Sequence, residues 1–306
     1  MKDLRIIYMG TPEFAVPSLQ ILVENGFNIV AVVTAPDKPK GRGQKLATSP
    51  VKDYAVSQDI PVLQPTNLKN PDFQAELKSY NANLQIVVAF RMLPVSVWDM
   101  PEIGTFNLHG SLLPQYRGAA PINWAIINGE KETGVTTFFL KHEIDTGNII
   151  FQEKEPIEED DTVGDLYVRL MERGAKLVLK TVQAIQAEDY PQDPQDESKE
   201  IKHAPKIFKE TCEIDWSKSS QEVYDFIRGL SPYPAAWTTL NGTNFKIFKA
   251  EKLQMAVAGD HPGDIKTDNK TYLHIQTGGN PLSITELQMQ GKKRMKIEDF
   301  LRGNKL

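Results

Sequence analysis

The strongest constraint on the fold is a series of short, continuously apolar segments separated by stretches with helical spacing. Residues 4–9 (LRIIYM) precede a helix-like segment, and residues 28–35 (NIVAVVTA) follow it, so the chain begins as strand, helix, strand. Strands that are apolar along their whole length are typical of a parallel sheet covered by helices on both faces. The sequence therefore predicts an α/β fold.

The same alternation continues to about residue 187. We expect further strands at 61–63, 84–90, 104–109, 134–140 and 148–157, and helices around 71–79, 119–129 and 162–185. The predicted architecture is Rossmann-like: an open, mostly parallel sheet with helices on both faces. The G-x-G-x-x-G fingerprint of dinucleotide sites is missing, since a single glycine, Gly10, ends the first strand, and we predict no bound NAD.

The character of the sequence changes after residue 187. Residues 188–206 are polar, contain three prolines and show no periodicity, which indicates a linker. The part that follows alternates or is rich in β-branched and aromatic residues at 245–253, 271–277 and 281–289. This pattern predicts a smaller, OB-like β-barrel domain. The predicted division is 1–187 for the α/β domain, 188–206 for the linker and 207–306 for the C-terminal domain.

Cysteine content and hydropathy exclude several classes of protein. The single cysteine, Cys212, rules out a disulfide within the chain. The N-terminus shows neither an apolar signal core nor an Arg- and Ser-rich transit segment. No apolar run approaches the ~18–20 residues that a membrane span needs. We therefore expect a cytoplasmic protein with no membrane partner.

Basic residues are concentrated in two places on a chain whose formal net charge is −5. Residues 36–52 hold five Lys and Arg against one Asp, and residues 292–306 hold six against two acidic residues. Two local basic patches on an acidic chain indicate a polyanionic partner that touches two separate places. Either patch by itself also fits a solvated loop.

Polar residues stand at the end of one predicted strand, in the stretch NLHGSLLPQYRGAAP at 107–121. Because strand side chains alternate between faces, Asn107 and His109 project to one side and Leu108 to the other. The carboxyl ends of strands form the edge at which open α/β sheets bind ligands. Gly110 leaves room for a ligand beside them. This strand end is therefore a candidate site.

Asp145, in a loop between two predicted strands, adds a carboxylate. An Asn amide donates to a developing oxyanion, a His moves a proton near neutral pH, and a carboxylate orients the imidazole or collects a proton. With no Cys or second His nearby at metal-ligand spacing, the set suits metal-free acyl-type transfer to an amine. The structural alternatives are a hydrogen-bonded strand end for His109, a loop contact for Asn107 and a simple turn at Asp145.

The run from His109 to Gly118, preceded by Asn107 and followed by Asp145-Thr146-Gly147, resembles the folate-dependent formyltransferases. The resemblance implies that Asn107, His109 and Asp145 are the catalytic residues. It also implies that the turn holds 10-formyltetrahydrofolate, the co-substrate. The folate-binding residues implied are Ser111, Leu112, Leu113 and Pro114.

Further segments extend the resemblance over nearly the whole chain. Residues 10–15 (GTPEFA) are similar to the start of the family, and residues 231–237 (SPYPAAW) to the opening of its C-terminal domain. The basic loop at 36–52 is similar to the loop with which members acting on methionyl-tRNA engage the acceptor end. Arg42 is the first candidate, since a guanidinium makes bidentate contacts with phosphate. The tRNA-binding residues implied are Lys38, Lys40, Arg42 and Lys45.

The resemblance thus implies formyl transfer from 10-formyltetrahydrofolate to the α-amino group of methionyl-initiator tRNA, which serves translation initiation. Residues 1–187 would be catalytic and residues 207–306 would bind tRNA; we expect a monomer. Three alternatives stay open: a formyltransferase for a small amine, a formyl-folate hydrolase, and a non-catalytic tRNA- or folate-binding protein. One departure from the family pattern is Lys141-His142-Glu143, where relatives often carry a Gly, and we expect His142 at the surface.

Overall fold

The computed structural model describes residues 2–40, 45–198, 200–254 and 258–306. Contacts divide the chain into two compact units that are interleaved in sequence. The first comprises Met1–Gly118, Gly134–Glu155 and Tyr167–His203, and the second Ala119–Thr133, Pro156–Leu166 and Ala204–Leu306. The predicted boundaries at residues 187 and 206 stay a prediction. No helix among the described residues is long and apolar enough to cross a membrane.

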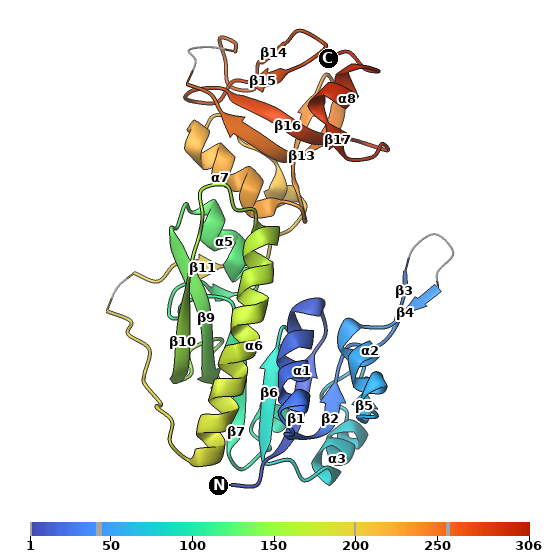
Figure 1. The fold of residues 1–306 in the computed structure, drawn as a ribbon, viewed down its shortest axis with the longest axis vertical. Coiled ribbons are helices and arrows are strands. Elements are labelled where there is room, and N and C mark those ends of the chain that lie inside the picture. The colour runs from blue at the N-terminus through green and yellow to red at the C-terminus, as the bar shows by residue number, and fades with distance from the viewer. Residues whose placement is uncertain (1, 41–44, 199, 255–257) are drawn as a thin grey trace. The chain divides into compact units, whose positions relative to one another are not determined.

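The first unit is built on a sheet with the spatial order β10-β9-β7-β6-β1-β2-β5 in the described part of the chain (Figure 1). Its strands are β1 (Arg5–Gly10), β2 (Asn28–Val33), β5 (Val62–Leu63), β6 (Leu84–Val88), β7 (Gly104–His109), β9 (Glu132–Phe139) and β10 (Ile149–Pro156). Strands β5, β2, β1, β6 and β7 pair in parallel, and β9 joins β7 in antiparallel fashion. The predicted mostly parallel sheet is confirmed.

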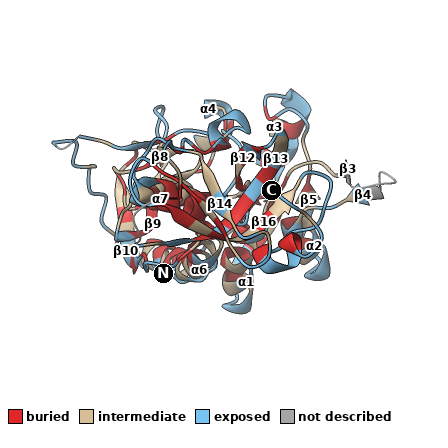
Figure 2. Cartoon of the chain, turned by 90° about the horizontal axis from the view of Figure 1, so that it is seen from above, coloured by how far each residue is buried: buried red, intermediate tan, exposed pale blue. Residues whose placement is uncertain are grey.

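Helices cover both faces of this sheet, as predicted. They are α1 (Val16–Glu24), α2 (Pro50–Ser57), α3 (Pro71–Ser79), α4 (Val95–Trp98) and most of α6 (Val163–Ala187). On one face Val87 belongs to a core cluster with Phe73 of α3 and Val97 of α4. On the other face Leu108 meets Gly174 of α6, where a Cβ would lie 2.7 Å from a Leu108 methyl carbon. Figure 2 shows the buried residues gathered along the strands.

Two helices of this unit begin at side chains suited to that position. Ser49 precedes α2 and accepts a hydrogen bond from the Lys52 amide, and Asn70 precedes α3 and accepts one from the Asp72 amide. Both helices have proline in the first turn, where no intrahelical N–H partner is needed. The sequence therefore sets these two starts locally, before any packing.

The second unit is a curled antiparallel sheet with helices. Its strands follow the order β12-β13-β16-β15-β14, and β17 pairs with β16. The elements are α5 (Pro121–Ile127), η2 (Glu210–Cys212), α7 (Ser220–Leu230), β12 (Ala236–Leu240), β13 (Thr243–Lys252), β14 (Ile265–Thr267), β15 (Leu273–Ile275), β16 (Leu282–Met289), β17 (Met295–Lys296) and α8 (Ile297–Leu301). Phe245, Ile247 and Leu287 from the sheet join Ile227 of α7 and Phe300 of α8 in one core. The predicted β-rich C-terminal fold is confirmed.

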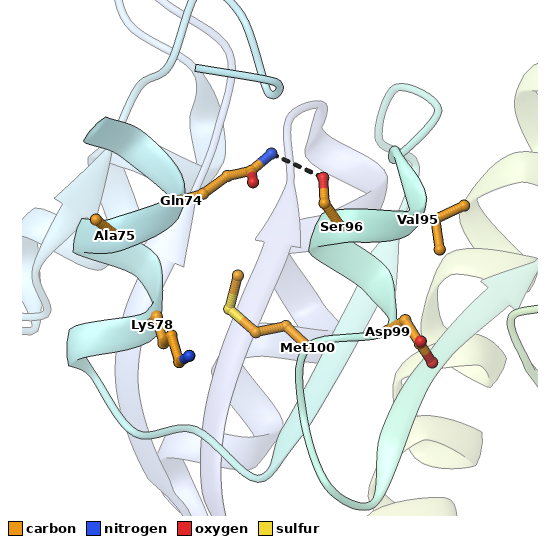
Figure 3. A pocket seen from close by; sticks show the side chains of 7 residues that line it. All are labelled: Gln74, Ala75, Lys78, Val95, Ser96, Asp99 and Met100. Atoms are coloured by element: carbon orange, nitrogen blue, oxygen red, sulfur yellow. Dashed lines mark hydrogen bonds between the residues drawn. The ribbon is translucent and has the colours of Figure 1, made fainter. Parts of the chain in front are cut away.

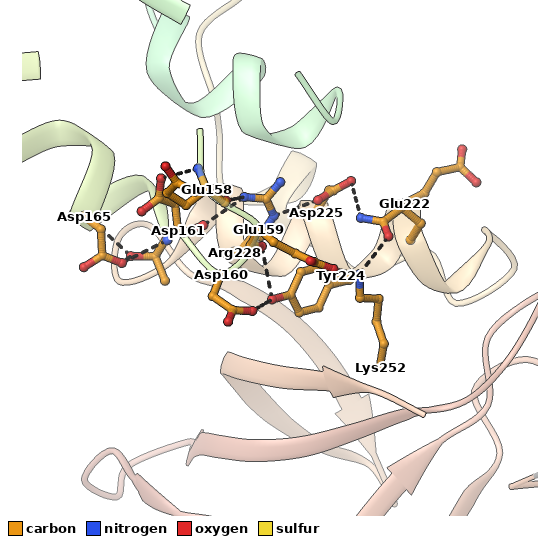
Figure 4. Close-up of polar contacts among 12 residues, drawn as sticks. Glu158, Glu159, Asp160, Asp161, Asp165, Glu222, Tyr224, Asp225, Arg228 and Lys252 are labelled. Carbon is orange, nitrogen blue, oxygen red and sulfur yellow. Dashed lines mark hydrogen bonds and ion pairs between the residues drawn. The ribbon is translucent and has the colours of Figure 1, made fainter. Parts of the chain in front are cut away.

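A buried arginine of α7, Arg228, binds residues 158–161 within this second unit (Figure 4). The Arg228 guanidinium donates from Nε to Asp225 Oδ1 at 2.7 Å, and both side chains are 5% exposed. The same guanidinium donates to the carbonyl oxygens of Asp161 (3.0 Å) and Glu158 (3.2 Å). A buried guanidinium is tolerated only with such partners, so this network fixes the 158–161 turn against the helix.

Candidate active site

The polar strand end predicted from the sequence lies at the carboxyl edge of the sheet. Asn107 of β7 pairs with Val87 of β6, and Gly10 at the end of β1 pairs with Val88, so three neighbouring strands finish together. Such an edge is where ligands bind in open α/β sheets. A Cβ on Gly10 would lie 2.7 Å from Ala15 Cβ, so only glycine allows the chain to turn this closely.

His109 is buried and held by the backbone of the turn that follows it. Its ring lies 2.8 Å, through Nε2, from the carbonyl oxygen of Tyr116. Because a carbonyl oxygen only accepts hydrogen bonds, Nε2 carries a proton and donates a hydrogen bond to the Tyr116 carbonyl. The second ring nitrogen, Nδ1, is 3.9 Å from Asp145 Oδ2, and His109 is 6% exposed. A second proton, on Nδ1, would therefore face the carboxylate.

Asp145 lies in a loop whose shape leaves little freedom. Its backbone has φ +56°, the left-handed region, and its Oδ2 accepts a hydrogen bond of 3.0 Å from the Gly118 amide. A Cβ on Gly147 would lie 1.5 Å from the carbonyl oxygen of Phe139, so that position requires glycine. The loop thus presents its carboxylate to His109 and to the chain after the turn.

Asn107 differs from His109 and Asp145 in that its side-chain amide is free. The side chain is half-buried on the same face of β7 as His109. Among the residues that the structure describes, the amide has no hydrogen-bond partner. A polar group in that state is available to a substrate, and an amide N–H suits a carbonyl oxygen that gains negative charge.

The Ser-Leu-Leu-Pro turn is bound tightly to the sheet. The Ser111 hydroxyl donates to the Gln115 carbonyl at 2.6 Å, and Ser111 is fully buried. Thr136 of β9 donates to the Ser111 carbonyl at 2.6 Å and accepts from the Leu113 amide at 3.2 Å. Leu113 is buried, whereas Leu112 and Pro114 are half-buried. The turn is therefore rigid, and the predicted folate residues divide into two facing inward and two partly open to solvent.

The basic loop forms a hairpin of β3 (Lys38–Lys40) and β4 (Lys45–Ala47). Lys38 is exposed, and Arg42 lies outside the described residues. Below the hairpin, Lys52 donates to Asp37 at 2.6 Å and to Gln64 at 2.8 Å. The hydrogen bonds from Lys52 and Gln64 hold the pKa of Asp37 below its usual value. Lys52 is thus a fixed part of the hairpin base.

A cavity elsewhere on this unit contains none of the predicted site residues. It measures about 460 Å³ and is open between α3 and the α4 segment (Figure 3). Its lining residues are Gln74, Ala75, Lys78, Val95, Ser96, Asp99 and Met100. Gln74 spans it with a hydrogen bond of 2.8 Å to Ser96. Sequence reasoning gave no signal for this cavity, and it brings together no acid, base or nucleophile of the proposed chemistry.

Two further residues contact the Asp145 loop or its neighbour Gly118, and the sequence did not predict either of them as part of the site. Arg117 directly precedes Gly118, whose amide binds the carboxylate, and Gln195 donates to the Asp145 carbonyl at 2.7 Å. No pattern in the polar segment around Gln195 distinguishes it from the other glutamines there. Arg117, in contrast, lies within residues 107–121, so the sequence could have predicted it as a site residue. His142, expected at the surface, is exposed, with its ring edge-on to Trp98 at 5.6 Å.

Comparison with known proteins identifies the class to which this fold and site belong. The formyl transferase family model matches residues 4–182, and the model of the formyl transferase C-terminal domain matches residues 206–305. The chain belongs to the formyl transferase family and is therefore an enzyme of formyl transfer.

In the described part of the chain, no group of three or more His, Cys, Asp or Glu side chains is placed to hold a metal ion.

Relatives that are more than 50% identical to this chain are one kind of enzyme within the class. The chain is 54% identical to a methionyl-tRNA formyltransferase of Bacteroides fragilis over 99% of its own length and 95% of the relative's. It is 58% identical to that of Phocaeicola vulgatus over 99% and 96%. Among solved structures, the sugar 3N-formyl transferase WlaRD, in the presence of dTDP and 5-N-formyl-THF, has a TM-score of 0.68 at 22% identity, covering 96% of this chain and 100% of WlaRD. A variant of HypX from Aquifex aeolicus also has 0.68, at 20% identity, over 99% of this chain and 49% of HypX.

Proposed function

We propose that this chain transfers the formyl group of 10-formyltetrahydrofolate to the α-amino group of methionyl-initiator tRNA, with Asn107, His109 and Asp145 as its catalytic residues. The observation that carries the residue roles is the convergence of an unpartnered amide, an imidazole and a carboxylate at one sheet edge. Methionyl-tRNA as the acceptor is supported by relatives that are 50% or more identical over nearly the whole chain.

In the proposed mechanism each of the three residues acts on the tetrahedral intermediate or on a proton. The amine attacks the formyl carbon, and Asn107 donates its amide N–H to the oxygen that becomes negative. A protonated His109 adds a positive charge that stabilises that oxygen. Asp145 stabilises the imidazolium and accepts the proton that the attacking amine loses. The tetrahedral intermediate then expels N10 of the folate, which leaves as tetrahydrofolate after taking up a proton.

Rigidity around the three residues serves this chemistry. The Tyr116 carbonyl fixes the His109 ring, and the Gly118 amide fixes the Asp145 carboxylate. Groups fixed in advance stabilise charge in the transition state without a cost for reorienting them during reaction. The folate is held at the turn, where Leu112 and Pro114 offer half-buried apolar surface. Ser111 and Leu113 keep the turn in shape from inside.

The hairpin at β3 and β4 binds the tRNA backbone. The proposed contacts are Lys38, Lys40, Arg42 and Lys45. Lysine and arginine that neutralise phosphates release counterions, so this part of the affinity depends steeply on salt. The basic C-terminal segment at 292–306 supplies a second place of contact. We propose that the enzyme works as a monomer in the cytoplasm, where aminoacylated tRNA is found.

One assay tests the proposed function. The protein is incubated with 10-formyltetrahydrofolate and either methionyl-tRNA or a panel of small amines, including an amino-sugar nucleotide. We expect formyl-methionyl-tRNA as the product and no transfer to the small amines. Absence of transfer to methionyl-tRNA overturns the proposal. Release of formate without an acceptor would instead identify a formyl-folate hydrolase. Binding of folate or tRNA without any turnover would identify a non-catalytic binding protein.

A further inference from the structure

The segment from residue 190 to residue 198, here called the strap, is hydrogen-bonded along the Asp145 loop. Asp193 and Ile149 exchange backbone hydrogen bonds of 2.8 and 3.0 Å. The Tyr190 ring lies against Phe139, with 5.9 Å between the ring centroids. Glu197 pairs with Arg117 at 2.7 Å. A part of the chain that reads as a polar linker thus lies against the candidate active site within the first unit.

Gln195 occupies the centre of the strap and uses both ends of its amide. Its Nε2 donates to the Asp145 carbonyl at 2.7 Å and to the Gly147 carbonyl at 2.9 Å. Its Oε1 accepts from Arg117 Nη2 at 2.6 Å and from Nε at 3.1 Å. One side chain therefore joins the backbone on both sides of Thr146 to the residue before Gly118.

These bonds close a ring around the Asp145 carboxylate. The Gly118 amide binds Oδ2 from one side, and Arg117, the neighbour of that glycine, binds Gln195, which in turn binds the Asp145 carbonyl. The residue that is held has a left-handed backbone (φ +56°), which is unfavourable for an aspartate unless the surroundings enforce it. Without Gln195, two loop carbonyls and the Arg117 guanidinium lose partners in a half-buried place.

We propose that Gln195 is a positioning residue, which sets the distance between the Asp145 carboxylate and the His109 ring by holding the loop and Arg117 together. The inference rests on the catalytic role proposed for Asp145. Gln195 donates to the backbone of the loop and acts on the reaction through Asp145. The strap is thereby a part of the active-site framework.

The test compares three variants of the full-length protein. Gln195→Ala removes both ends of the amide, and Gln195→Glu keeps the size and the Arg117 partner but loses the two N–H donors. Gln192→Ala is the matched control, because Gln192 is an exposed glutamine of the same strap. We expect kcat to fall about 10²-fold in both Gln195 variants, as displacement of a catalytic group by ~1 Å does, with KM for folate and tRNA within twofold of the parent. Gln192→Ala should match the parent.

A double variant separates positioning from a general structural effect. If Gln195 acts through Asp145, Gln195→Ala should reduce kcat little further in the Asp145→Asn background, because the two losses are not additive. Additive losses overturn the proposal, as does parental kcat in Gln195→Glu while Asp145→Asn is impaired. If Asp145→Asn itself keeps parental kcat, the proposed function of Asp145 fails instead. Should Gln195→Ala not fold, Gln195→Glu decides the question.

Discussion

The edge of the β-sheet and the basic hairpin differ in how their polar groups are used. At the edge, His109 and Asp145 are buried or nearly so, and each is bound by a backbone group of the 116–118 segment. In the hairpin, Lys38 is exposed, and the network of Lys52, Asp37 and Gln64 lies at the base. Buried, fixed groups suit the proposed chemistry, because they stabilise charge without reorienting, whereas exposed basic groups suit the proposed binding of phosphate. Changes at the edge should therefore lower kcat, and changes in the hairpin should raise KM for tRNA.

The largest effect is expected at the end of β7. His109→Ala and Asn107→Ala should each lower kcat about 10³-fold, because each removes a group that stabilises charge formed only in the transition state. Both variants should stay folded: Asn107→Ala at the parental unfolding temperature, and His109→Ala at a somewhat lower one, because the Tyr116 carbonyl loses its donor. Steady-state formylation of methionyl-tRNA measures the first, and circular dichroism the second. Parental kcat in either variant would remove that residue from the catalytic set.

The next effect tests the rigidity of the Asp145 loop. Gly147→Ala places a methyl group 1.5 Å from the Phe139 carbonyl oxygen, so the loop must move. We expect kcat to fall about 10²-fold with displacement of the carboxylate by ~1 Å. Gly303→Ala is the control, because nothing lies within 4 Å of a Cβ there and no left-handed backbone is involved. Equal activities of these two variants would show that the loop adapts without consequence.

A smaller effect, and one of a different kind, is expected in the hairpin. Arg42→Ala should raise KM for tRNA and leave kcat within twofold. The slope of log affinity against log salt should fall by about one, since one phosphate contact is lost. Lys176→Ala, an exposed lysine of α6, is the control for loss of positive charge. A lowered kcat with unchanged KM in Arg42→Ala contradicts the division between the two regions.

The smallest effect concerns the base of the hairpin and pH. The pKa of Asp37 is lower in the folded protein than its ordinary value of 3.8, chiefly through the hydrogen bond from Lys52. A depressed carboxyl pKa stabilises the fold above the ordinary value and loses that contribution as pH falls through the folded value. Hydrogen-exchange protection of β3 and β4 should therefore persist at pH 4 and weaken below it. Lys52→Met should show a weaker dependence, because only the Gln64 hydrogen bond to Asp37 remains, and an identical profile would refute the assignment.

Much of the fold was predictable because its determinants are local. The apolar runs at 4–9, 84–90 and 104–109 became β1, β6 and β7 within a few residues of the expected bounds, and the predicted helix at 71–79 became α3. Periodicity reports which side of a strand or helix is buried, and this depends on neighbouring residues alone. Assignment of the acceptor came from resemblance over the whole chain and from relatives, since no local pattern names a tRNA.

The site was predictable only in part. Alternation along the strand places Asn107 and His109 on one face, and Gly110 leaves space beside them. The same reasoning could not distinguish Gln195 from Gln192, because both stand in a polar segment without periodicity. It also counted Lys52 among the five basic residues of the patch at 36–52, although the Lys52 ammonium group is bound to Asp37 and Gln64.

The order of strands and helices, and the face of β7 on which Asn107 and His109 project, follow from the amino-acid sequence. The approach of Asp145 to within 3.9 Å of His109 depends on tertiary packing, and so does the binding of the Asp145 backbone by Gln195, fifty positions further along the chain. Contacts at such separation depend on how the sheet and the strap pack together, and no short stretch of residues encodes that packing. The proposed catalytic site is therefore encoded locally at the end of β7 and completed by residues from distant parts of the chain.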